Sequence, residues 1–343
     1  MRMAAEESKL ARLLAEARGF SVEFDPYLAN HLPMVLVILD RLGAPPSRLE
    51  GFFETYRDAS GLKPAPDDQG RIHDVNWQAH FGERAYEGDY RGFFARQVQE
   101  QGVETVLRRH LPALVPGIAA SALHALMRAA YGRLQGDAQE VSVALGYWCA
   151  TYLPLRFAGK SEPVTEDPVE ILLRLQAIDE LRDVHPDSDL LWRWMREVSR
   201  KAAFPPVADW LRAGPDALDR IAAASLAFYA QTMTFEALHA LTGTHWLRLM
   251  RPDWPDEGLA VRYFWQAIAA VYPKIGMPDL PSTGALAAMR ERPAPDWPEI
   301  KARACASDDE HDISLVFSAF EEERHRGDPL YRVVAARRVG LLP

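Results

Sequence analysis

Apolar residues recur along the whole chain at the spacing of one helix face, and this pattern predicts an all-α protein. Residues 31–42 (HLPMVLVILDRL) and 234–250 are clear examples, with apolar side chains repeated every three or four positions. We find no convincing run of alternating β-branched residues between Asn-Gly or Asp-Gly turns. We therefore expect a compact bundle or array of ten or more helices.

Two polar segments interrupt this helical pattern. Residues 61–77 and residues 158–167 (AGKSEPVTED) are rich in turn-forming or charged residues and predict exposed loops. We expect a single domain over residues 1–343, and its two helical halves could meet near 158–167. Helices are predicted at roughly 3–18, 31–42, 46–57, 88–109, 117–134, 138–154, 168–182, 187–201, 205–212, 215–231, 234–250, 257–272, 282–291, 308–325 and 328–338.

The composition favours a soluble, cytoplasmic protein, and we expect a small molecule as its partner. Apolar residues make up 48% of the chain, and the net charge of −9 argues against a nucleic-acid partner. The sequence lacks both an apolar signal peptide and a run of 18 apolar residues, so we expect no membrane association. Cys149 and Cys305 are far apart and predict neither a disulfide framework nor a thiolate zinc site. The composition leaves the oligomeric state open.

Several motifs of common enzyme classes are missing from the sequence. We find no GxGxxG after a strand, no GxxxxGK[ST], no GxSxG and no HExxH. With so few predicted strands, a Rossmann sheet is not expected. A flavin or nicotinamide bound tightly in a dinucleotide fold is therefore disfavoured.

Four histidines on four separate predicted helices are expected to point inward. His31, His124, His239 and His311 each share a helix face with apolar or small residues. Imidazole is a common ligand for iron, copper and zinc, and the interior of a helical bundle is a usual place for such a centre. Spacing alone leaves the alternative open that each is an ordinary core histidine.

The other histidines are weaker candidates. His245 lies six residues after His239, about 120° around an ideal helix, so both reach one site only if the helix is distorted near Gly243. The remaining five are expected at the surface: His73, His80, His110, His185 and His325. Glu236 and His239 match one Glu-x-x-His element of a di-metal bundle, but such a centre needs two copies.

Four segments resemble the questin oxidase-like family and occur in the right order. They are residues 30–57 (NHLPMVLVILDRLGAPPSRLEGFFETYR), 111–132 (LPALVPGIAASALHALMRAAYG), 235–250 (FEALHALTGTHWLRLM) and 308–323 (DDEHDISLVFSAFEEE). The resemblance implies a helical fold and oxidative tailoring of aromatic polyketides, with Fe(II) held by histidines in part of the family. For fungal members it also implies Baeyer–Villiger-like or ring-opening oxidation of anthraquinones, with NADPH as a reductant for some.

The resemblance also suggests roles for individual residues. His31, His124, His239 and His311 match the recurrent histidines and are the expected metal ligands, and His245 matches less well. Fungal relatives tend to have a histidine where this chain has Arg128, which could bind a phenolate or carboxylate or else pair with an internal Asp or Glu. We take Arg128, Tyr131 and His245 as candidate catalytic residues.

The leading hypothesis is an oxidoreductase with histidine-bound non-haem iron that oxidises an aromatic or quinone-like substrate. Two alternatives remain open at this point. One is a helical small-molecule-binding protein without catalysis. The other is a metal-dependent hydrolase, because histidine-bound zinc activates water.

Overall fold

The computed structural model describes residues 8–156, 162–204 and 207–343 and is built almost entirely of helices, which confirms the predicted all-α class. Within these ranges, seventeen α-helices and one two-stranded hairpin are present. The first nine helices are α1 (Lys9–Ala17), α2 (Leu32–Leu42), α3 (Pro46–Ser60), α4 (Glu87–Gln101), α5 (Val103–Leu114), α6 (His124–Gln135), α7 (Ala138–Ala150), α8 (Pro168–Gln176) and α9 (Leu191–Arg200).

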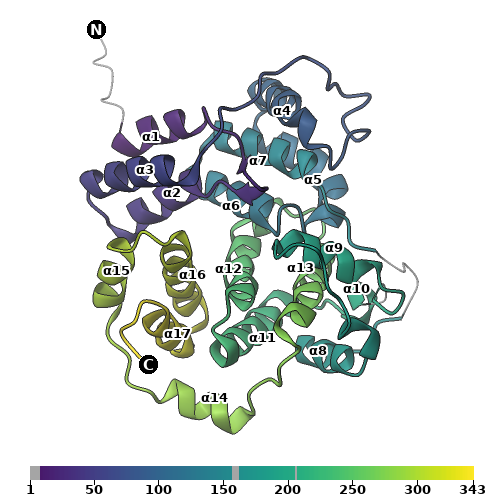
Figure 1. Ribbon diagram of the computed structural model, residues 1–343, viewed down its shortest axis with the longest axis vertical. Coiled ribbons are helices and arrows are strands. Elements are labelled where there is room, and N and C mark those ends of the chain that lie inside the picture. The colour runs from purple at the N-terminus through teal and green to yellow at the C-terminus, as the bar shows by residue number, and fades with distance from the viewer. Residues whose placement is uncertain (1–7, 157–161, 205–206) are drawn as a thin grey trace.

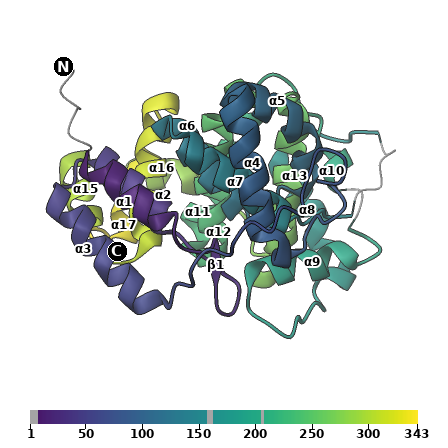
Figure 2. The same cartoon turned by 90° about the horizontal axis from the view of Figure 1, so that it is seen from above.

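The remaining elements complete the array seen in Figure 1. The later helices are α10 (Val207–Trp210), α11 (Ala217–Thr232), α12 (Phe235–Leu249), α13 (Glu257–Val271), α14 (Thr283–Arg290), α15 (Trp297–Cys305), α16 (Glu310–Arg326) and α17 (Leu330–Arg338). Short 3-10 turns are η1 (Arg84–Tyr86), η2 (Val115–Gly117), η3 (Asp179–Leu181), η4 (Arg251–Asp253) and η5 (Tyr272–Ile275). The strands are β1 (Glu23–Phe24) and β2 (Leu28–Ala29), and Figure 2 shows their connecting loop projecting at the edge of the molecule.

Four helices from distant parts of the sequence form a closed ring at the centre. Helix α2 packs on α6, α6 on α12, α12 on α16, and α16 again on α2. Figure 1 shows α16 and α12 side by side beneath α2 and α6. These are the four helices on which the inward-facing histidines were predicted.

Helix α2 illustrates how the local sequence sets one wall of this ring. Asn30 Oδ1 accepts the backbone N–H of Leu32, the first residue of the helix, at 3.1 Å and so satisfies one of its free donors. The helix ends at Gly43, whose φ of 88° is readily adopted only by glycine. Every residue between these ends is buried except Asp40 and Arg41, as expected for a helix surrounded by others.

Some predicted helix boundaries were wrong. The helix predicted at 88–109 is two helices, because Gly102 adopts a φ of 79° and breaks the hydrogen-bond ladder. The helix predicted at 117–134 begins only at His124, after a tight turn. Helix α15 was not predicted.

The hydrophobic core includes residues from both sides of the boundary predicted near residues 158–167. Buried side chains from α2 to α17 belong to one continuous cluster. Residues 158–161 lie outside the described ranges, and residues 162–167 are exposed or half-buried. The single-domain organisation stays a prediction. Among the described helices, none has the length and apolar character needed to cross a membrane.

Gly243 in α12 generates a prediction about packing. A Cβ atom there would lie 2.5 Å from Phe264 Cε2 of α13, well inside van der Waals contact. We expect Gly243→Ala to lower the free energy of unfolding by about 1–3 kcal/mol, the usual cost of overpacking, although alanine is the better helix former. Chemical denaturation measures this change.

Gly51 in α3 is the matched control, because a Cβ there meets no described atom within 4 Å. Gly51→Ala should therefore stabilise the protein, by roughly 0.5–1 kcal/mol. Equal effects of the two substitutions would contradict the close contact between α12 and α13.

Candidate functional site

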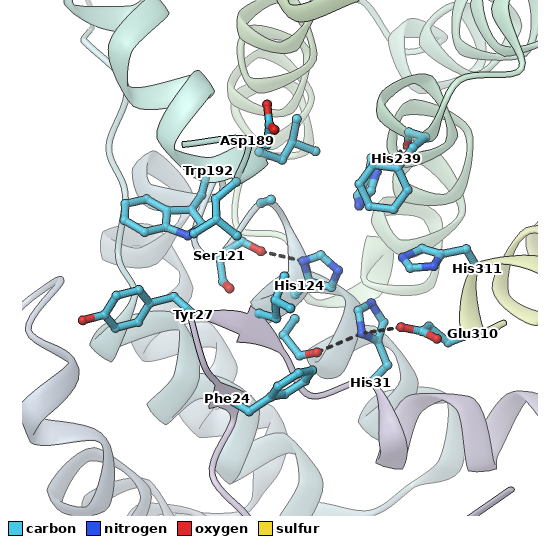
Figure 3. A pocket seen from close by; sticks show the side chains of 16 residues that line it. Phe24, Tyr27, His31, Ser121, His124, Asp189, Trp192, His239, Glu310 and His311 are labelled. Carbon is cyan, nitrogen blue, oxygen red and sulfur yellow. Dashed lines mark hydrogen bonds and ion pairs between the residues drawn. The ribbon is translucent and has the colours of Figure 1, made fainter. Parts of the chain in front are cut away.

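The ring of helices brings four histidines to the edge of one cavity. His31 is the residue just before α2, His124 is the first of α6, His239 is the fifth of α12 and His311 is the second of α16. The cavity has a volume of about 270 Å³, and all four side chains line it. Figure 3 shows the four imidazoles around one space.

The distances between the rings follow the order of the helices. The ring centroids are 4.6 Å apart for His31 and His124, and 5.5 Å apart for His124 and His239. The distances are 6.4 Å from His239 to His311 and 5.3 Å from His311 back to His31. The Phe235 ring contacts both members of the most widely spaced pair, at 4.9 Å from His239 and 4.8 Å from His311.

Each imidazole is held through the same ring atom. The Nδ1 atoms of His31, His124 and His239 donate to the backbone carbonyls of Ala29, Ser121 and Phe235, at 2.9, 2.5 and 2.9 Å. His311 Nδ1 instead lies 2.9 Å from the carboxylate oxygen Asp309 Oδ1. Because carbonyl oxygens only accept, Nδ1 carries the proton in the first three rings and Nε2 keeps its lone pair.

Burial keeps three of the imidazoles neutral. Desolvation, with a smaller repulsion from His124, lowers the pKa of His31 well below its usual value. Desolvation likewise lowers the pKa of His124 to about 4 and that of His239 to about 3. His31 and His124 also lie at the N-terminal ends of their helices, where the helix dipole disfavours an imidazolium. Neutral imidazole is the form that binds metals.

Two carboxylates accompany the rings on α16. The hydrogen bond from His311 is the main cause that lowers the pKa of Asp309 to about 2, and Arg338 Nη2 pairs with the same carboxylate at 2.7 Å. Glu310 Oε1 lies 3.8 Å from His31 Nδ1 and lines the cavity. His31, Glu310 and His311 offer ligand atoms that all lie within 4.8 Å of one another. Glu310 is not among the site residues predicted from the sequence, although its position beside His311 was a usable signal.

Aromatic side chains form the outer part of the cavity. Phe24, Tyr27, Trp192 and Phe235 line it, and they come from the β1–β2 hairpin, α9 and the start of α12. The rings of Tyr27 and Trp192 meet edge to face at 6.3 Å, and the Arg84 guanidinium lies over both. Tyr27 and Phe235 are each 46% exposed, so the cavity reaches solvent beside these two side chains.

The structure places Arg128 away from this cavity. Its Nε donates to Glu140 Oε2 at 3.0 Å, and its Nη2 forms an ion pair with the same oxygen at 2.9 Å. Arg128 lines a separate space of about 10 Å³, room for one water at most. Arg128 is therefore paired with an internal carboxylate, that of Glu140, which is one of the two alternatives that the sequence left open.

Tyr131 and His245 also lie outside the cavity. His245 Nδ1 is 3.1 Å from Ser318 Oγ, and its ring packs on Phe317 at 5.4 Å. Tyr131 OH accepts from Trp246 Nε1 at 3.3 Å. Helix α12 runs without a break through Gly243, so His245 faces away from His239. The structure does not bring Arg128, Tyr131 and His245 into contact with a ligand in the cavity.

Glu236 does not join His239 at the site. Its Oε1 pairs with Lys274 Nζ at 3.1 Å, and it is not among the residues that line the cavity. The Glu-x-x-His pattern therefore has its carboxylate in an ion pair with η5.

The fold and cavity define an all-α protein with a histidine-lined pocket, and comparison with known proteins gives its family. A family model described as questin oxidase-like matches residues 28–318. The chain belongs to the questin oxidase-like family, as the resemblance in the sequence implied, and membership suggests an oxidoreductase. A search of curated proteins found no match.

The Arg128–Glu140 pair predicts a large loss of stability for Arg128→Met. The substitution leaves the Glu140 carboxylate buried and still paired with Arg18 Nη1 at 3.3 Å. We expect the free energy of unfolding to fall by about 3 kcal/mol. This value is at the lower end of the usual cost of breaking a buried ion pair, because Arg18 remains as a partner of Glu140. Urea denaturation measures the loss, and Arg128→Met/Glu140→Leu should recover most of it. Unchanged stability with weaker binding of acidic aromatics would instead support a role in substrate binding.

His110 generates a prediction about pH. We expected it at the surface, but it is fully buried among Trp77, Phe93 and Phe94, and burial lowers its pKa to about 4. The unfolded chain binds this proton below about pH 6.5 and the folded one only near pH 4, so stability falls as the pH drops through this window. His110→Leu should remove up to about 1.4 kcal/mol of loss per pH unit. Urea denaturation at pH 7 and pH 5 tests this, and parallel pH profiles would contradict it.

Proposed function

We propose that this chain is a non-haem iron oxygenase in which His31, His124, His239 and His311 hold Fe(II). The observation that carries the proposal is the shared orientation of the rings: each Nδ1 is bound to a protein oxygen, so each Nε2 is left as the metal-binding atom. Metal-ligating histidines typically donate their second ring nitrogen to a carbonyl or carboxylate in this way.

The spacing of the rings fits one shared ion in part. With a metal–nitrogen distance near 2.1 Å, each ring centroid would lie roughly 3.2 Å from the metal. Neighbouring rings would then be separated by roughly 4.5 Å at right angles and 6.4 Å across the metal. The rings of His124 and His311 lie 4.6 and 5.3 Å from that of His31, near the first of these values. Among the described residues, the ligand atoms within 4.8 Å of one another are those of His31, Glu310 and His311. His124 and His239 lie outside this group, so their rings would move toward it when the ion binds.

The presence of Glu310 at the site favours iron over a metal that prefers a ligand set made of nitrogen atoms alone. The Glu310 carboxylate lies beside His31 and His311 and could add an anionic oxygen ligand to the imidazoles. Imidazole combined with carboxylate is typical of non-haem Fe(II) oxygenases. Fe(II) at this position would supply the reaction with dioxygen.

The outer part of the cavity suits a flat aromatic or quinone-like substrate. Phe24, Tyr27, Trp192 and Phe235 offer ring surfaces for stacking, and the volume of about 270 Å³ is close to the lower end for small-molecule pockets. These side chains would hold the substrate over the histidines and exclude water from them. The aromatic polyketides associated with the family have this shape.

Metal analysis tests the proposal directly. Protein loaded with Fe(II) without oxygen and then desalted should contain one iron per chain, because the ligand set is complete within the chain. Replacing His31, His124, His239 or His311 with Ala should lower the iron affinity by at least about tenfold. Elemental analysis and helical circular dichroism should be read together, so that loss of iron is separated from loss of fold.

His245→Gln is the matched control, since His245 is a buried histidine of the same helix as His239 but lies outside the cavity. It should keep one iron per chain. Wild-type protein without bound iron, or a His245→Gln control that loses iron as the ligand variants do, would refute the site.

The same measurements test the hydrolase alternative. Binding of zinc in preference to iron, together with hydrolysis in the absence of oxygen, would favour a hydrolase.

The reaction type is tested by oxygen uptake with a hydroxylated anthraquinone. Insertion of one oxygen atom, as in a Baeyer–Villiger-like reaction, needs two electrons from a reductant such as NADPH to reduce the second atom to water. Ring opening that incorporates both atoms needs none. We expect iron-dependent oxygen uptake, and its dependence on NADPH separates these two reactions.

A further inference from the structure

The chain enters α6 through an unusual backbone segment immediately before His124. Three consecutive residues other than glycine, Ser121, Ala122 and Leu123, have φ angles of 45°, 54° and 74°. In this left-handed region the Cβ atom crowds the following carbonyl oxygen, so residues with a side chain rarely adopt it, least of all three in succession. Such a turn persists only where surrounding groups hold it.

The Ser121 side chain is held from two sides. Its hydroxyl donates to Glu23 Oε1 at 2.5 Å and accepts from the Tyr147 hydroxyl at 2.7 Å. Arg84 anchors Glu23 in turn, with its Nε 2.6 Å from Oε2. Glu23, Ser121 and Tyr147 are all buried, so water competes little for these bonds.

The same residue holds His124 through its backbone. The carbonyl oxygen of Ser121 accepts the His124 Nδ1–H at 2.5 Å, and the peptide plane of the turn sets the direction of this bond. Rotation of the turn toward ordinary φ values would move this carbonyl. His124 would then lose the bond that fixes its ring and its tautomer.

We propose that Glu23 and Ser121 are positioning residues that keep His124 ready to bind the metal by locking the left-handed turn before it. This inference rests on the proposed function, in which His124 is a ligand. Neither residue needs to touch the metal. Glu23 comes from the β1–β2 hairpin and Arg84 lies over Trp192, so the lock also connects the mouth of the cavity to its floor.

Two substitutions of Ser121 test the lock. Ser121→Ala removes the hydroxyl but keeps the Cβ, so the turn is no longer held and remains unfavourable. Ser121→Gly also removes the hydroxyl, yet glycine adopts a positive φ without steric cost. We expect Ser121→Ala to weaken Co(II) binding about 10-fold to 100-fold, the usual range for partners of metal ligands, and Ser121→Gly to recover most of this loss. Equal affinities of wild type and both variants, or equal losses in the two, would overturn the proposal.

Glu23→Gln and Glu87→Gln provide a matched pair of buried carboxylates. Glu87 binds Ser21, the Val22 backbone and Arg91, and no bond to the turn is present among the described residues. Glu23→Gln should weaken Co(II) binding, and Ala122→Gly added to it should restore affinity by easing the turn. Glu87→Gln should change affinity less than twofold. Loss of affinity in both single variants without rescue would mean that the carboxylates serve only general stability.

A measurement on metal-free protein separates this inference from the proposed function. Nitrogen NMR of labelled histidines should show His124 with its proton on Nδ1 in the wild type, and a mixture of tautomers in Ser121→Ala and Glu23→Gln. If the wild type binds neither Fe(II) nor Co(II), the proposed function fails, and the tautomer still decides whether the lock acts on His124. An unchanged tautomer in both variants would overturn the lock alone.

Discussion

Several imidazoles share one space at the centre of this protein, and the need to keep them neutral there governs what surrounds them. Burial lowers the pKa of His31, His124 and His239, and protons on two of these rings would repel each other. Each of these three rings has its remaining proton committed to a carbonyl of its own chain segment. The closed packing of α2, α6, α12 and α16 buries the rings in this way, because these side-by-side helices present them to one cavity.

Helix α16 differs from the other three walls because it supplies charge. Asp309 caps the helix by accepting the His311 backbone N–H at 2.8 Å and also binds the His311 ring. Arg338 of α17 pairs with the other oxygen of this carboxylate, so the C-terminal helix stabilises the site although Arg338 does not line the cavity. Glu310 adds a second carboxylate on the cavity side. A metal cation would find neutral nitrogen ligands on three walls and negative charge on the fourth.

Buried ion pairs outside the cavity serve the scaffold. Arg128 and Glu140 join α6 to α7, and Arg84 and Glu23 join η1 to the hairpin. The second pair has a further consequence, because Glu23 also binds the turn that leads into His124. The mouth of the cavity and one of its histidines thus depend on the same carboxylate. A buried charge is costly unless it is paired, so each ion pair also favours the packing of the two elements that carry its partners.

The sequence by itself determined the helical class, the family and which four helices carry inward histidines. Apolar spacing in segments such as residues 31–42 reports which face of a helix is buried, and this property is local. The sequence also placed Arg128 one turn from His124, but it did not show that Arg128 would pair with Glu140 on the next helix. The left-handed turn at Ser121 and the approach of Glu310 to His31 were likewise decided by the tertiary structure. Contacts between residues far apart in sequence depend on how helices pack, and no periodicity along the chain records that.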